Sequence, residues 1–185
     1  MKRRISDPDV RMLADTAATL ESNYVDKAQE EERAWADSPF HWIRKKRGNT
    51  IAKIGKELIR ALCAARGLCV VDAKGGKGGG ADLVIEGHRV RLKRATLSEG
   101  KYIFNQIRDE DFEYLMCLGL SPFDAHCWVI PKHVAIDQSS VQSSVQHGPR
   151  TDWTSFSPAH PPAGLRAYGG TISEAFTVLQ RLTAR

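Results

Sequence analysis

The chain has 185 residues, of which 42% are hydrophobic and 26% are charged, an ordinary composition for a globular domain. Lys and Arg outnumber Asp and Glu by 27 to 22, which gives a formal net charge of +5. No apolar run reaches transmembrane length, no signal peptide is recognisable, and the four cysteines form no CxxC pair, so we expect a cytoplasmic protein without a membrane span or a zinc cluster.

A helical arm is predicted at about residues 7–34. Asp7-Pro8 is typical of a helix start, with Asp as the N-cap and Pro in the first turn. Apolar residues then recur on one face at steps of three and four: Val10, Leu13, Ala17, Leu20 and Tyr24. Such a stripe predicts either packing across a core or dimerisation, and packing is the simpler interpretation.

A basic segment follows, with eight basic residues and one acid, Glu57, between His41 and Arg66. This clustering suits DNA, although a solvated basic face has the same composition. A second helix is predicted over Thr50–Arg66, ending at Gly67. Glu57 pairs with a neighbouring Lys or Arg on that helix, or else supports a metal. We assign DNA contacts here to Lys45, Lys46, Arg47 and Lys53.

Residues 81–95, ADLVIEGHRVRLKRA, predict two strands joined by a Gly-His turn, because apolar and polar residues alternate. Asp82 stands at the head of the first strand and Lys93 lies late in the second. A carboxylate that holds a hard cation and a lysine that neutralises charge are core parts of a metal-dependent phosphodiester-cutting site. The preceding loop KGGKGGG either approaches a DNA backbone through Lys74 and Lys77 or is a flexible connection.

The remaining chain predicts an extended or helix-opening stretch at 101–107, a helix at Arg108–Leu118 and a strand at Trp128–Ile130. A surface loop at 147–170 and a last helix opened by the capping box Thr171–Glu174 complete it. We therefore expect one α+β domain over 1–185, an α/β/α sandwich with a mixed central sheet flanked by helices, carrying the N-terminal arm.

The order of these elements resembles the PD-(D/E)XK nuclease superfamily, particularly type II restriction endonucleases. The similar stretches span residues 38 to about 176: SPFHWIRKKRGNTIAKIGKELIRAL, ADLVIEGHRVRLKRATL, FNQIRDEDFEYLMCLGLSPFDAHCWVIPK and YGGTISEAF. The resemblance implies that Asp82 binds Mg²⁺ or Mn²⁺, that Lys93 assists the attacking water, and that Glu57 supports the metal.

One position departs from that pattern, because Arg91 stands where the family has an acid, two residues before Lys93. A guanidinium cannot ligate a cation. Three explanations stay open. The second ligand comes from Gln106, Glu86 or Glu99; or the protein binds DNA without cutting it; or Arg91 silences a once-active enzyme.

The leading hypothesis is a restriction-type endonuclease that hydrolyses double-stranded DNA with a divalent metal, and whether Arg91 impairs its activity stays open. Its site residues are Asp82, Lys93, Glu57, Arg91 and Gln106, and cutting both strands requires a homodimer or a partner subunit. The alternative is a catalytically inactive DNA-binding or partner subunit on the same scaffold. In that alternative Arg91, Lys93 and Arg94 form an anion-binding strand.

Overall fold

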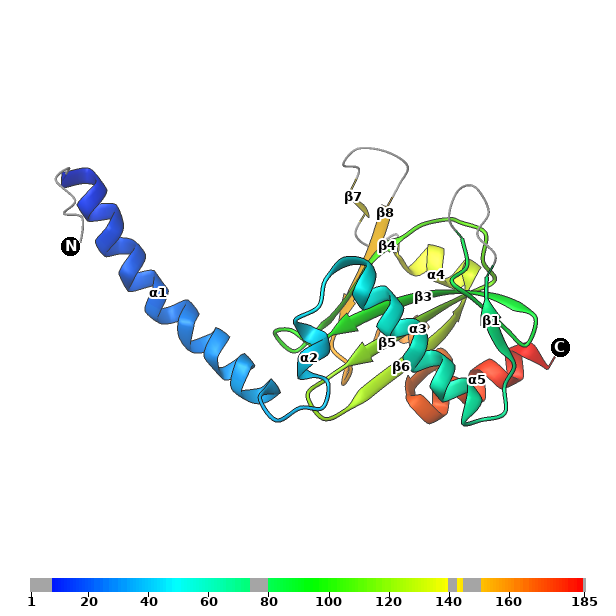
Figure 1. The fold of residues 1–185 in the computed structure, drawn as a ribbon. Coiled ribbons are helices and arrows are strands. Elements are labelled where there is room, and N and C mark those ends of the chain that lie inside the picture. Colours follow the sequence, from blue (N-terminus) through cyan, green and yellow to red (C-terminus); the bar gives the residue numbers. More distant parts are fainter. Residues whose placement is uncertain (1–7, 74–79, 140–142, 145–150, 185) are drawn as a thin grey trace. The chain divides into compact units, whose positions relative to one another are not determined.

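A computed structural model describes residues 8–73, 80–139, 143–144 and 151–184. The chain divides into two compact units, residues 1–38 and 39–185. In the first unit, α1 (Pro8–Trp35) covers the predicted helical arm (Figure 1). Its apolar residues Val10, Leu13 and Leu20 expose 48%, 63% and 51% of their surface.

The second unit is built on a six-stranded sheet with the strand order β1-β2-β3-β5-β6-β9 (Figure 1). Parallel pairing joins β3 to β5, while the other neighbours in this order are antiparallel, so the sheet is mixed as predicted. The strands are β1 (Val70–Asp72), β2 (Leu83–Ile85), β3 (His88–Thr96), β5 (Tyr114–Leu120), β6 (Ala125–Pro131) and β9 (Gly169–Thr171).

The hairpin of β2 and β3 forms as predicted, but its turn lies one residue earlier than expected. Ile85 pairs with His88, so the two turn residues are Glu86 and Gly87 rather than Gly87 and His88. Both have positive φ, 50° and 84°. This conformation matches the twist of the flanking strands, and it sets which residues of β3 share a face.

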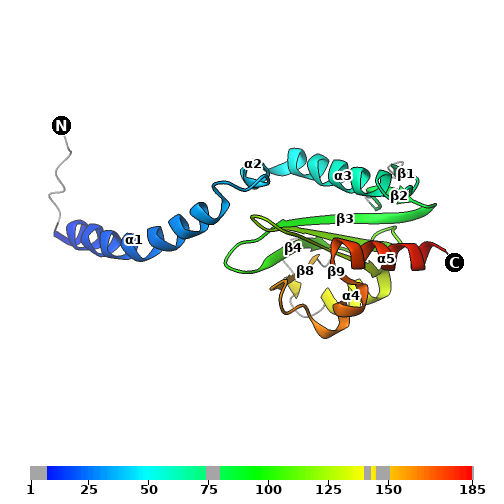
Figure 2. The same cartoon turned by 90° about the horizontal axis from the view of Figure 1, so that it is seen from below.

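Two helices pack on one face of the sheet. α3 (Gly48–Ala64), preceded by the short α2 (His41–Arg44), supplies Ile59 and Cys63 to this core. Figure 2 shows α3 running along β3. α5 (Ile172–Thr183) supplies Phe176 and Leu179 and begins with the predicted capping box at Thr171. Burial of these apolar stripes against the sheet is what makes the two segments helical in context.

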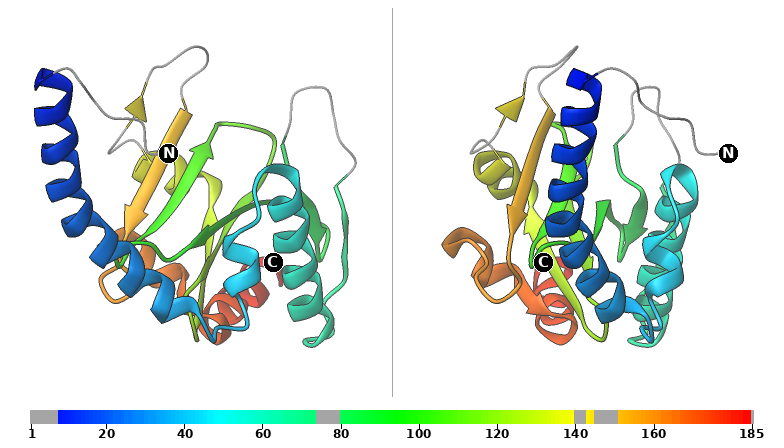
Figure 3. Two further views of the ribbon diagram at one scale, coloured as in Figure 1. Left: turned by 60° about the vertical axis from the view of Figure 1, so that its left-hand side comes forward. Right: turned by 90° about the vertical axis from the view of Figure 1, so that its left-hand side faces the viewer.

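The other face is covered by a second, three-stranded sheet together with α4 (Lys132–Ser139) and the 3₁₀ turn Ala163–Tyr168. Its strand order is β4-β8-β7, and β4 and β8 run side by side (Figure 3). The strands are β4 (Tyr102–Ile107), β7 (Ser143–Ser144) and β8 (Thr151–Phe156). The structure thus confirms the α+β class with a mixed central sheet flanked by helices.

The helix predicted over Arg108–Leu118 is wrong. Residues 108–113 form a loop, and β5 then runs through the middle of the sheet. Its residues are buried on both faces, with Leu115 and Cys117 in one core and Met116 and Leu118 in the other. A central strand buried on both faces lacks polar alternation, so a short apolar run there does not separate strand from helix.

The surface loop predicted at 147–170 also contains regular structure, because β8 and the 3₁₀ turn lie within it and β9 begins at its end. β9 is a short edge strand of two glycines and a threonine, which the Pro- and Gly-rich composition concealed.

Candidate functional site

A pocket of about 390 Å³ lies where β3 runs past the end of its neighbour β2. The last residue of β3 in that pairing is Val90, so residues 91–96 have a different environment from the hairpin. α3 lines the pocket on one side and the end of β4 on the other. The structure thereby brings Asp82, Lys93, Arg91, Gln106 and Arg94 together.

Asp82 is bound to the backbone of β3. Its Oδ2 accepts a hydrogen bond from the Leu92 amide at 2.8 Å, just past the last β2–β3 pair. The carboxylate thereby takes the place of a carbonyl from a neighbouring strand, and this gives Asp82 a structural role whatever chemistry it supports.

Arg91 lies between two carboxylates. Its Nη1 is 3.6 Å from Oδ2 of Asp82, and its Nη2 is 3.3 Å from Oε2 of Glu110. Nη1 also donates to the carbonyl oxygen of Gly80 at 2.7 Å. The side chains of Arg91, Asp82 and Glu110 are 24%, 25% and 15% exposed, so their charges interact more strongly than at a fully solvated surface.

Glu110 did not emerge from the sequence as a site residue. It belongs to the loop 108–113, which the sequence predicted to be helical. The loop reaches Arg91 because β5, which follows it, pairs in parallel with β3, with Arg91 opposite Leu115. An acid-rich stretch, RDED, was the available signal, but its position depends on that long-range pairing.

As arranged, these residues do not fit a resident Mg²⁺ or Mn²⁺. Such ions need several oxygen ligands, whereas the described residues include no group of three or more Asp, Glu, His or Cys placed to hold a metal. The two carboxylates near the pocket face the guanidinium of Arg91, and one Asp82 oxygen is bonded to the Leu92 amide. The positive charge that faces these two carboxylates is that of Arg91.

Lys93 has an unusual protonation equilibrium. Burial, reinforced by the positive charge of Arg91, lowers its pKa from 10.5 to about 8, while Asp82 and Glu110 act in the opposite direction. The ammonium form therefore predominates at neutral pH, where it can neutralise an anionic oxygen, and it loses its proton more readily than a solvated lysine.

The end of β4 adds neutral polar groups. Asn105 and Gln106 line the pocket at a register irregularity between Phe104 and Ile107 in the pairing with β8. Gln106 has a positive φ of 59°, which is uncommon for a residue other than glycine. Bulges of this kind re-aim side chains and occur often beside functional sites.

The other acidic candidates lie elsewhere. Glu57 exposes 75% of its side chain and pairs with Arg60 on the same helix at 3.6 Å, which is the simpler of the two predicted roles. Glu86 lies in the hairpin turn and accepts a hydrogen bond from the Cys69 amide. Glu99 lies in the turn before β4 and does not line the pocket.

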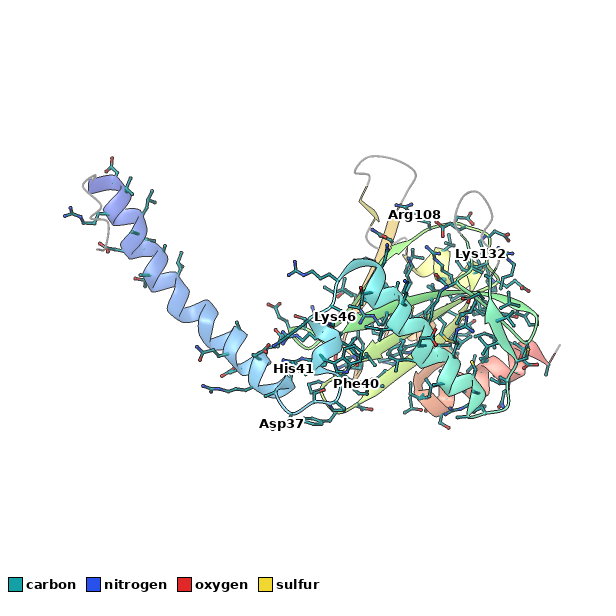
Figure 4. All side chains as sticks on the ribbon, viewed as in Figure 1. Asp37, Phe40, His41, Lys46, Arg108 and Lys132 are labelled. Carbon is teal, nitrogen blue, oxygen red and sulfur yellow. The ribbon has the colours of Figure 1, made fainter. Side chains whose placement is uncertain are left out.

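The predicted DNA contacts divide into three groups. Lys45, Lys46, Arg47 and Lys53 are exposed on the α2–α3 segment, where Figure 4 labels Lys46. Arg94 lies in the pocket. Lys74 and Lys77 fall outside the described residues. Lys56, which the sequence did not select, lines the pocket and also contacts Asp72 at 3.2 Å.

A solved structure with a similar fold is that of a bacterial homing endonuclease, I-Ssp6803I. The two share 18% sequence identity with a TM-score of 0.50, and the match covers 75% of this chain and 96% of that chain. No protein-family model and no curated protein matches the sequence. No helix among the described residues is long and apolar enough to cross a membrane. The similarity to I-Ssp6803I shows a shared fold, with a central sheet and flanking helices.

Proposed function

We propose that this chain is a DNA nuclease-like protein whose pocket at Asp82 receives a phosphodiester of double-stranded DNA. The observation that carries this proposal is the charge of the pocket. Among its described lining residues, four are cationic and one is acidic: Lys56, Arg91, Lys93, Arg94 and Asp82. The fold shared with a homing endonuclease supports DNA as the polyanion.

The exposed basic residues before and on α3 extend the proposed footprint. Lys45, Lys46, Arg47 and Lys53 belong to the segment that leads into and forms the helix beside the pocket. Contacts of this type fix the position of a protein on a duplex without reading its sequence.

The geometry favours binding without cleavage. Arg91 is fixed between Asp82 and Glu110 and neutralises the carboxylates that a metal-dependent nuclease would need. With Arg91 in place, the pocket can hold a phosphate by charge, while the described part of the chain assembles no group of acidic, His or Cys side chains for a divalent cation.

Hydrolysis is the second candidate, and the closeness of Asp82, Glu110 and Lys93 supports it. In this alternative the protein is a restriction-type endonuclease of the PD-(D/E)XK superfamily that uses Mg²⁺ or Mn²⁺. Gln106 would then contribute a neutral oxygen from the end of β4. Cutting both strands would require a homodimer or a partner subunit, and a cytoplasmic location would give access to DNA.

The test compares the natural chain with Arg91→Glu and Asp82→Ala on mixed plasmid and phage DNA, with and without Mg²⁺ or Mn²⁺. We expect the natural chain to bind DNA equally well in chelator and to leave it intact. Metal-dependent cleavage by the natural chain that Asp82→Ala abolishes would establish the hydrolytic candidate instead.

Arg91→Glu separates two forms of the binding proposal. If this variant cuts DNA, the scaffold is a nuclease that Arg91 silences. If it binds DNA but does not cut, the protein is a binding subunit. Absence of DNA binding by the natural chain would refute the proposal as a whole.

A further inference from the structure

Arg94 differs from the other cations of the pocket in how its charge is compensated. It follows Lys93 on β3, and its aliphatic stem lies against α3 at Gly55, where an added β-carbon would be 3.5 Å from Cδ of Arg94. The close approach of helix and strand at this glycine holds the stem and leaves the guanidinium at the pocket.

Two nitrogens of this guanidinium are shielded from solvent and lack an acceptor. Nε and Nη1 of Arg94 are buried, and neither has a hydrogen-bond partner among the described residues. Leaving charged donors unsatisfied is unfavourable, because their hydration is lost without a replacement. Burial alone lowers the pKa of Arg94 to about 10, without a contribution from a carboxylate.

The other pocket cations have acidic neighbours. Arg91 faces Asp82 and Glu110, and Lys56 lies 3.2 Å from Asp72. The charge of Lys93 is favoured by the same two carboxylates that face Arg91. Arg94 therefore carries the one positive charge of the pocket that the described residues do not balance. The uncharged polar side chains that also line the pocket are amides, which add hydrogen-bond donors but no negative charge: Asn49, Asn105 and Gln106.

We propose that Arg94 is the phosphate receptor of this pocket. A guanidinium binds a phosphate through its N–H donors, and two donors of Arg94, on Nε and Nη1, have no acceptor among the described residues. Because both nitrogens are shielded from solvent, phosphate binding would require a rotation about the terminal bonds of the side chain that turns them toward the pocket. As a DNA contact this assignment rests on the proposed function, but the same chemistry would bind free phosphate.

The DNA arm measures binding to a short duplex over a series of salt concentrations for the natural chain, Arg94→Gln and Arg94→Lys. We expect Arg94→Gln to weaken binding about tenfold and to reduce the slope of log K against log[salt] by about one, the value for one lost phosphate contact. Arg94→Lys should retain the slope and recover part of the affinity, because it keeps the charge but not the paired donors.

Arg181→Gln is the matched control, since it removes the same charge from an exposed position on α5. Unfolding curves of all variants establish that each is folded. If Arg94→Gln and Arg181→Gln change the affinity and the slope equally, Arg94 is not a phosphate receptor, while DNA binding by the protein stands.

The free-phosphate arm compares the melting temperature in inorganic phosphate and in chloride at equal ionic strength. If the natural chain fails to bind DNA, the proposed function fails. The Arg94 assignment then holds when phosphate stabilises the natural chain but not Arg94→Gln. It is refuted when phosphate has no effect on the natural chain, or the same effect on both.

Discussion

Lys93 is the pocket residue with the clearest pH-dependent effect on stability. In the unfolded chain its pKa is near 10.5, whereas in the folded protein it is about 8. Between pH 8 and pH 10.5 the unfolded state binds more protons at Lys93 than the folded state does, so the contribution of Lys93 to stability rises with pH. Below pH 8 the penalty for burying the charge is fully present.

We therefore expect Lys93→Met to raise the free energy of unfolding at pH 7 by roughly 1–3 kcal/mol, less than the full pKa shift implies because the side chain is partly exposed. Urea denaturation at pH 7 and pH 10 measures the difference from the natural chain, which should shrink at the higher pH. A gain of equal size at both pH values would show that packing, not charge, is responsible.

Asp82 combines a backbone hydrogen bond with a charge facing Arg91. Asp82→Ala should lower the free energy of unfolding by about 1–3 kcal/mol, because the Leu92 amide loses its acceptor and Arg91 loses an anion. Asp82→Asn keeps an acceptor and should lose less. Equal losses in chemical denaturation would argue against the backbone hydrogen bond as the main contribution.

The sequence predicted several pocket residues because a strand pattern orders them locally. Asp82, Arg91 and Lys93 belong to one hairpin, so period-two alternation and one turn set their spacing. Glu110 could not be predicted, because it reaches Arg91 through the pairing of β3 with β5. The contact of Glu57, by contrast, is local, because its partner Arg60 lies three residues further along the same helix.

At the scale of elements, α3 packs closely on β3 at Gly55. A β-carbon there would lie 3.5 Å from Arg94 and 3.6 Å from Leu92, which is ordinary van der Waals contact. Gly55→Ala should therefore stabilise the protein by about 0.5–1 kcal/mol, because alanine has the higher helix propensity. Thermal unfolding measures this change.

Gly55→Leu is the contrasting variant. A larger side chain would push the helix from the strand and move Arg94, so we expect a loss of about 1–3 kcal/mol and weaker DNA binding. If leucine were tolerated with unchanged affinity, the close approach at Gly55 would not be what positions the guanidinium.

Elements with a polar and an apolar face were predicted well from the sequence, while elements enclosed by the core were not. α3 and α5 carry one apolar stripe each, and the β2–β3 hairpin alternates. In β5, by contrast, six successive residues are buried, so the periodicity that separates strand from helix is missing. The prediction placed the hairpin turn one residue too late, at Gly87-His88 instead of Glu86-Gly87, because more than one dipeptide in this stretch can adopt positive φ.

For the whole molecule, the division of the chain after Ser38 predicts that residues 39–185 fold without α1. Both cores described above are formed by residues of this second unit. We expect the fragment to unfold in one cooperative transition with a far-ultraviolet spectrum that retains the strand signal. A fragment that lacks a cooperative transition would show that α1 is part of the folding unit.

The apolar residues exposed on α1 allow the predicted homodimer to be tested separately. Leu13→Glu would place a charge on the stripe formed by Val10, Leu13 and Leu20. If α1 joins two copies, sedimentation of the full chain should give the dimer mass and that of Leu13→Glu the monomer mass. Equal masses for the two chains would exclude this helix face from self-association.

The parallel pairing of β3 with β5 also bears on the order of folding. β5 and β6 are joined by four residues and can pair early, whereas β3 joins β5 only after the chain has passed through β4, whose partner β8 lies much later in the sequence. Pairings between distant segments form slowly, since loop entropy is lost before contacts compensate. In pulse-labelling hydrogen exchange, we therefore expect the β3 amides that bond to β5 to gain protection after the amides of the β5–β6 hairpin.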